Sequence, residues 1–135
     1  MTRSLLIAVD FDGTVVEDRY PAIGKPLPFA IETLTMLQND GHRLILWTYR
    51  HGQKLAEAEA FLKNQGIELY AVNRSYPEES SHPRDVSRKI HADLFIDDRN
   101  VGGFPGWGVV YQQLSSDDRP PTRKRKGWWR GFRQT

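Results

Sequence analysis

The sequence predicts an α/β fold, with a parallel sheet of about five strands and helices on both of its faces. Two observations carry this prediction. Short, continuously apolar runs alternate along the chain with longer segments whose apolar residues recur at helical spacing. Such runs are typical of strands buried on both faces, and Gly or Pro residues separate them from the helical segments. Strands and helices that alternate in this way form parallel sheets with right-handed crossovers.

The first strand is expected over residues 5–9, where the sequence reads LLIAV. A loop rich in Pro and Gly follows and leads to a helix over 28–40, because Pro28 suits a first helical turn and Gly41 suits a helix end. The residues expected on the buried face of this helix are Ile31, Leu34 and Leu37.

A second strand is expected at 42–48 and a second helix at 53–66, with Leu55, Ala58 and Leu62 facing inward. The run at 67–72 predicts a third strand. A polar loop then leads to a short helix at 85–91. A fourth strand is expected within 93–98, and GVVYQQL at 108–114 favours a fifth.

Length and composition indicate one globular domain at 1–115 and a basic, disordered tail at 116–135. Residues 1–116 carry 12 Lys and Arg against 15 Asp and Glu, whereas residues 117–135 carry 7 against 2. The high isoelectric point therefore belongs to the tail. The chain has no cysteine, so a disulfide framework and thiolate metal sites are excluded. No signal peptide or membrane span is expected, and the expected location is the cytoplasm.

Polar side chains follow three of the expected strands. Asp10 and Asp12 follow the first, Thr48 ends the second, and the pair Asp97 and Asp98 ends the fourth. The carboxyl ends of parallel strands meet at one edge, where open α/β sheets bind ligands. Several carboxylates at one edge suit a hard cation with oxygen ligands. The sequence therefore predicts Mg²⁺ together with a substrate phosphate.

The order of these pieces resembles the haloacid dehalogenase superfamily, over roughly residues 5–111. DFDGT at 10–14 is similar to the first motif, Thr48 to the second, Lys89 to the third and LFIDDRN at 94–100 to the fourth. The resemblance implies a small branch of magnesium-dependent phosphatases with a three-layer, Rossmann-like α/β/α core and no cap domain.

The resemblance also implies roles. Asp10 would attack phosphorus and form an aspartyl-phosphate, while Asp12 would act as general acid and then as general base. Lys89 would neutralise charge on the transferred group, with Arg88 as the alternative. The implied catalytic residues are Asp10, Asp12, Thr48 and Lys89. The implied metal ligands are Asp10, Asp12 through its backbone carbonyl, Asp97 and Asp98.

Phosphate or substrate contacts are expected from Gly13, Thr48, Tyr49 and Arg50, with Tyr20, His51, Arg74 and Arg99 as weaker candidates. The segments at 14–28 and 49–88 leave no room for a cap domain, so the site should be open. An open site suits a phosphorylated macromolecule or a nucleic-acid end. Alternatively, a neighbouring subunit of a homo-oligomer covers the site over a small substrate.

Other functions stay open at this level. The basic, Trp-containing segment at 119–133 favours nucleic acid or an anionic surface as a partner. A binding module that works through this tail is therefore the alternative to a phosphatase. Dehalogenase chemistry fits less well because it does not need Asp12. The receiver domains of signalling systems place their acidic pair after the first strand rather than after a late one.

Overall fold

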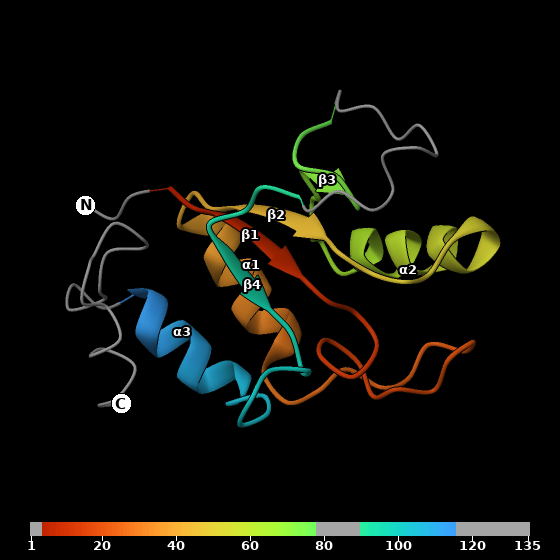
Figure 1. Cartoon of the computed structure of the whole chain (residues 1–135), viewed down its shortest axis with the longest axis horizontal. Coiled ribbons are helices and arrows are strands. Elements are labelled where there is room, and N and C mark those ends of the chain that lie inside the picture. Colours follow the sequence, from red (N-terminus) through yellow and green to blue (C-terminus); the bar gives the residue numbers. More distant parts are fainter. Residues whose placement is uncertain (1–3, 78–89, 116–135) are drawn as a thin grey trace.

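The computed structural model of the chain describes residues 4–77 and 90–115. Within them the protein is an α/β fold whose parallel sheet has four strands in the order β3-β2-β1-β4 (Figure 1). The strands are β1 (Leu6–Val9), β2 (Arg43–Leu46), β3 (Ala71–Val72) and β4 (Leu94–Ile96), and the helices are α1 (Ala30–Asn39), α2 (Gly52–Asn64) and α3 (Trp107–Ser115).

The described helices pack on one face of the sheet. The main core joins Ile7 and Val9 of β1 to Leu34 of α1, Leu62 of α2 and Trp107 of α3. The strand order explains why α1 and α2 share this face. The chain moves in one direction from β1 to β2 to β3, and right-handed crossovers then place both helices on the same side. The second face carries a smaller cluster, formed by Ala8, Ile45, Ala71 and Ile90.

The expected helical faces are confirmed. Leu34 and Leu37 of α1 are 2% and 0% exposed, and Ala58 and Leu62 of α2 are 0% and 2% exposed. Ile31 and Leu55 are partly buried against the same core. Helix α1 begins later than expected. Pro28 precedes the helix, and Phe29 occupies the N-cap position in the left-handed region, with φ 65°.

The expected fifth strand is wrong, because residues 107–115 form helix α3. The Val-Val-Tyr run has high strand propensity, but the burial of apolar side chains on one helical face outweighs this local preference. Trp107, Val110 and Leu114 are buried, and their spacing of three and four residues places them on one helical face. The sheet therefore has four strands among the described residues.

The other boundaries differ in smaller ways. The third strand is shorter than the apolar run suggests, since only Ala71 and Val72 pair with β2. The tail at 116–135 and all but the last two residues of the helix expected at 85–91 lie outside the described residues. No helix in the described part of the chain is long and apolar enough to cross a membrane.

Candidate active site

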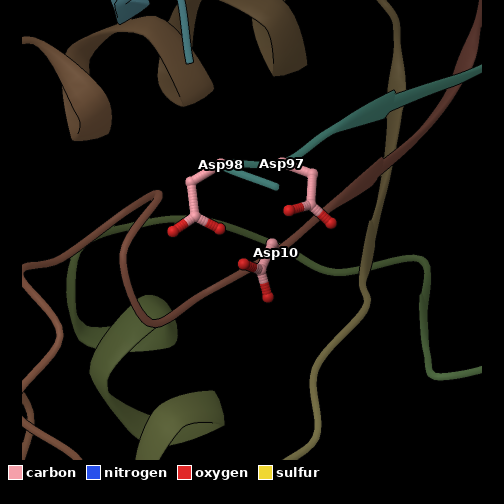
Figure 2. A group of neighbouring side chains, drawn as sticks. All are labelled: Asp10, Asp97 and Asp98. Atoms are coloured by element: carbon pink, nitrogen blue, oxygen red, sulfur yellow. The ribbon is translucent and has the colours of Figure 1, made fainter. Parts of the chain in front are cut away.

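Two central strands bring three carboxylates together at the carboxyl edge of the sheet. Strands β1 and β4 are parallel neighbours, and the Asp10 amide continues their ladder by donating to the Ile96 carbonyl over 3.0 Å. Asp10 directly follows β1, while Asp97 and Asp98 directly follow β4. One carboxylate oxygen from each of the three lies within 4.8 Å of the others. Figure 2 shows the three groups pointing toward one another.

The cluster is electrostatically unfavourable without a cation. Burial raises the pKa of Asp10 from 3.8 to about 7, although a hydrogen bond from the Phe11 backbone lowers it, and the charges of Asp97 and Asp98 raise it further. Asp98 Oδ1 is buried and has no hydrogen-bond partner among the described residues. A carboxylate oxygen left this way loses hydration without compensation. A hard cation would supply the missing partner, so the donor set fits Mg²⁺.

Gly13 gives the cluster its room. Its φ is +87°, a region that L side chains rarely adopt, and a Cβ at this position would collide with Asp98 Oδ2. The turn around Gly13 is held by backbone hydrogen bonds, which include Gly13 N–H to the Val16 carbonyl at 2.8 Å. A residue without a side chain is therefore needed for the first loop to reach Asp98.

The side chain of Asp12 belongs to a different group, the ion pair with Arg50. Arg50 Nε donates to one Asp12 oxygen and Nη2 to the other, both at 2.7 Å. The Arg50 side chain is 1% exposed and that of Asp12 is 16% exposed. This hydrogen bond raises the pKa of Arg50 above its ordinary value. The pair is thus a two-pronged, mostly buried contact, the strong form of a salt bridge.

The expectation that Arg50 contacts a substrate phosphate does not fit this geometry. Besides Asp12, Arg50 donates to the carbonyls of Pro21, Ala22 and Lys54. These bonds use all five N–H donors of a guanidinium. The Phe11 and Tyr20 rings flank the group at 5.2 and 5.0 Å. Arg50 therefore joins Asp12 to the loop after β1 and to the start of α2.

The remaining expected residues divide into three kinds. Thr48 is half-buried after β2, where its hydroxyl accepts a hydrogen bond from the Arg50 amide at 3.1 Å and its own amide donates to Asn73 Oδ1 at 2.8 Å. Tyr49 is 92% exposed. Lys89 and its alternative, Arg88, lie outside the described residues. The roles of all four stay predictions, as does the Asp12 carbonyl as a ligand.

Sequence reasoning missed two residues that support Asp10. The fully buried Thr14 donates its hydroxyl to Asp10 Oδ2 at 3.2 Å. The Trp107 indole N–H in turn donates to the Thr14 carbonyl at 2.7 Å. Helical spacing of Trp107, Val110 and Leu114 was the available signal for α3. The contact itself joins residues 93 positions apart, and no local pattern announces it.

Comparison with known proteins places the chain in a family. A solved structure from Bacteroides thetaiotaomicron, described as a conserved protein coded by locus, is 55% identical and has a TM-score of 0.77, covering 84% of this chain and 91% of that chain. The chain belongs to the family of this Bacteroides protein. No family model matches the chain. No curated protein matches it either. The Bacteroides relative therefore supports the α/β fold, and the chemistry has to be argued from the site.

Proposed function

We propose that the protein is a magnesium-dependent phosphomonoester hydrolase that works through an aspartyl-phosphate on Asp10. The observation that carries the proposal is the convergence of carboxylate oxygens from Asp10, Asp97 and Asp98 within 4.8 Å at the carboxyl edge of the sheet. The buried, unpartnered Asp98 oxygen adds to it. Both features fit a cation held by carboxylates beside a bound phosphate.

Asp10, Asp97 and Asp98 would hold Mg²⁺, with the Asp12 carbonyl as a further ligand. Bound there, Mg²⁺ would neutralise charge on the phosphate and on the cluster. With that charge neutralised, Asp10 would be ionised at neutral pH and its carboxylate could act as the nucleophile. The Thr14 hydroxyl, at 3.2 Å from Asp10 Oδ2, orients the carboxylate. Thr48, at the end of β2, would bind a phosphoryl oxygen.

The reaction proceeds in two displacements. An Asp10 oxygen attacks phosphorus, the bond from phosphorus to the leaving oxygen breaks, and that oxygen takes a proton from the carboxyl group of Asp12. Water then attacks the same phosphorus, the bond to Asp10 breaks, and phosphate is released. Asp12 takes the proton from that water. Its two oxygens accept from Arg50, so at least one of these bonds has to open for the transfer.

The finer features implied by the haloacid dehalogenase resemblance belong to the same proposal. Between β1 and α1 the described chain holds turns and isolated bridges, and no helix of a cap domain. The three-layer, Rossmann-like core that the resemblance implies also stays part of the proposal, because the described helices pack on one face of the sheet.

Hydrolysis of acetyl phosphate and 4-nitrophenyl phosphate, with and without Mg²⁺, tests the proposal. We expect turnover that needs Mg²⁺ and that falls by at least about 10³-fold in Asp10→Asn. Asp40→Asn is the matched control, because Asp40 accepts a hydrogen bond from Tyr111 and follows α1. Folded wild-type protein that binds Mg²⁺ but hydrolyses neither compound would contradict the proposal. That result would favour the binding module that works through the tail at 119–133.

A further inference from the structure

Three of the loops at the carboxyl edge each present an exposed tyrosine. Tyr20, Tyr49 and Tyr76 lie on the connections that follow β1, β2 and β3, and we call them the rim tyrosines. Their exposed fractions are 52%, 92% and 47%. Exposed aromatic side chains on loops that flank a site are candidates for contacts with its ligand. This edge is also the one that carries the carboxylate cluster.

Tyr20 is the rim tyrosine whose position is fixed by contacts. Its ring lies 5.0 Å from the guanidinium carbon of Arg50, a cation–π contact. Arg50 is itself held by Asp12 and by three backbone carbonyls. One side of the Tyr20 ring is thus supported beside Asp12, while about half of the side chain faces solvent. A supported ring with a free side is what a stacking platform requires.

Basic side chains accompany these rings. Arg74 precedes Tyr76 by two positions, and the exposed Arg99 directly follows Asp98 of the cluster. Arg74 donates to the Pro77 carbonyl, and neither arginine forms an ion pair with another described residue. Both can therefore attract further negative charge to the edge. Rings combined with cations suit a ligand that has flat, apolar faces and more than one negative charge.

We propose that the substrate is a nucleoside phosphomonoester, either a free nucleotide or the phosphorylated end of a single strand, whose base stacks on Tyr20. This inference rests on the proposed phosphatase function and names its substrate class. The phosphate would be bound beside Asp10 at the carboxylate cluster, and the base would lie against the free side of the Tyr20 ring. Stacking on an aromatic side chain tolerates every base, so the site selects for the presence of a base rather than for its identity.

The test compares kcat/KM for AMP and for ribose 5-phosphate, which lacks the base. We expect AMP to be preferred about tenfold or more, Tyr20→Phe to retain this preference, and Tyr20→Leu to reduce it to about onefold. Tyr70→Leu is the matched control, because Tyr70 also lies over an arginine, Arg43, at 4.8 Å, but next to the opposite end of β2. A 5′-phosphorylated hexanucleotide distinguishes a strand end from a free nucleotide, and a preference for either supports the inference.

The experiments distinguish a wrong substrate class from a wrong phosphatase function. Acetyl phosphate carries no base, so its Mg²⁺-dependent hydrolysis together with equal kcat/KM for AMP and ribose 5-phosphate would keep the function and overturn the substrate class. Equal losses on both substrates in Tyr20→Leu would show that Tyr20 is only structural and overturn the inference as well. If nothing is hydrolysed, calorimetry with the wild-type protein and Mg²⁺ decides whether the base contributes to binding. We expect AMP to bind about tenfold more tightly than ribose 5-phosphate, and equal binding would overturn the inference.

Discussion

Position 13 shows how a single residue shapes the carboxylate cluster. Gly13 combines a positive φ with a contact to Asp98 that leaves no space for a Cβ. Arg50 shows the converse, since it fills its surroundings with five directed bonds and so fixes Asp12. Both residues act on neighbouring carboxylates: Gly13 by leaving space, and Arg50 by supplying charge and donors.

Gly13→Ala is expected to weaken Mg²⁺ binding about tenfold or more, because the new methyl group displaces Asp98. Gly41→Ala is the matched control. Gly41 also has a positive φ, +96°, but a methyl group there would meet no other atom within 4 Å. Both variants should lose about 1 kcal/mol or more of unfolding free energy through backbone strain. Calorimetric titration with Mg²⁺ measures the difference, and equal affinities of the two variants would contradict the role given to Gly13.

Arg50→Met is expected to cost about 3–5 kcal/mol of unfolding free energy, since it leaves Asp12 and three carbonyls without their donor. Arg50→Lys should recover only part of this loss, because an ammonium cannot reproduce the planar fork. Urea denaturation gives the values. The control is Arg43→Met, at an exposed arginine over Tyr70, for which we expect less than about 1 kcal/mol. A loss of less than about 1 kcal/mol in Arg50→Met would mean that the buried hydrogen bonds of Arg50 contribute little to the free energy of unfolding.

At the scale of the elements, α3 has a second task besides covering the sheet. Its first residue, Trp107, reaches the Thr14 carbonyl, and Thr14 reaches Asp10. The Phe104 ring packs against Trp107 at 5.5 Å and supports it. The last described helix thereby fixes the loop after the first strand, so the position of the proposed nucleophile depends on both ends of the described chain.

Trp107→Phe tests this connection, because phenylalanine fills much of the same volume but cannot donate to Thr14. We expect a loss of about 1–2 kcal/mol of unfolding free energy and a several-fold lower kcat with 4-nitrophenyl phosphate. Trp47→Phe is the control, at a partly buried tryptophan that packs against Phe95 beside the second core cluster. Urea denaturation of both variants gives the change in unfolding free energy, and steady-state kinetics give the change in kcat. Wild-type kcat and stability in Trp107→Phe would contradict the proposed link.

For the whole molecule, the carboxylate cluster is expected to make the free energy of unfolding depend on pH and on any bound cation. The pKa of Asp10 is raised from 3.8 to about 7 in the folded, metal-free protein. The folded state therefore binds a proton more tightly than the unfolded state. The resulting stabilisation is full below pH 4 and is lost as the pH rises through 7. The metal-free fold is therefore less stable near neutral pH than at acidic pH, and a cation bound at the proposed site would offset this loss of stability.

We expect this contribution of Asp10 to stabilise the metal-free protein by about 1–2 kcal/mol more at pH 5 than at pH 8. The full shift would correspond to about 4 kcal/mol, but solvent screening of this partly exposed group reduces it. Mg²⁺ should stabilise the protein more at pH 8 than at pH 5. Asp10→Asn removes the titrating group, so the difference between its urea denaturation curves and those of the wild type isolates the effect. Identical pH dependence in both proteins would contradict this account.

Local patterns were enough to predict most of the helices and strands and the convergence of three carboxylates at one edge of the sheet. Strands and helices have readable periods, and the carboxyl ends of parallel strands share an edge. Asp10, Asp97 and Asp98 could therefore be brought together without coordinates, and the structure places one oxygen of each within 4.8 Å of the others. Helical spacing likewise predicts four core residues that the structure buries: Leu34, Leu37, Ala58 and Leu62.

Helix α3 and the contacts between distant residues could not be predicted from local patterns, because they depend on tertiary packing. Helix α3 formed where the Val-Val-Tyr run favours a strand, because burying Trp107, Val110 and Leu114 together outweighs local propensity. Asp12 and Arg50 are 38 positions apart, and Thr14 and Trp107 are 93 apart. Contacts over such separations depend on how the helices and strands pack, and the local sequence around each residue does not predict them. Which strands end in acidic residues can be read along the chain, whereas packing sets which of those acids face one another and which one Arg50 binds.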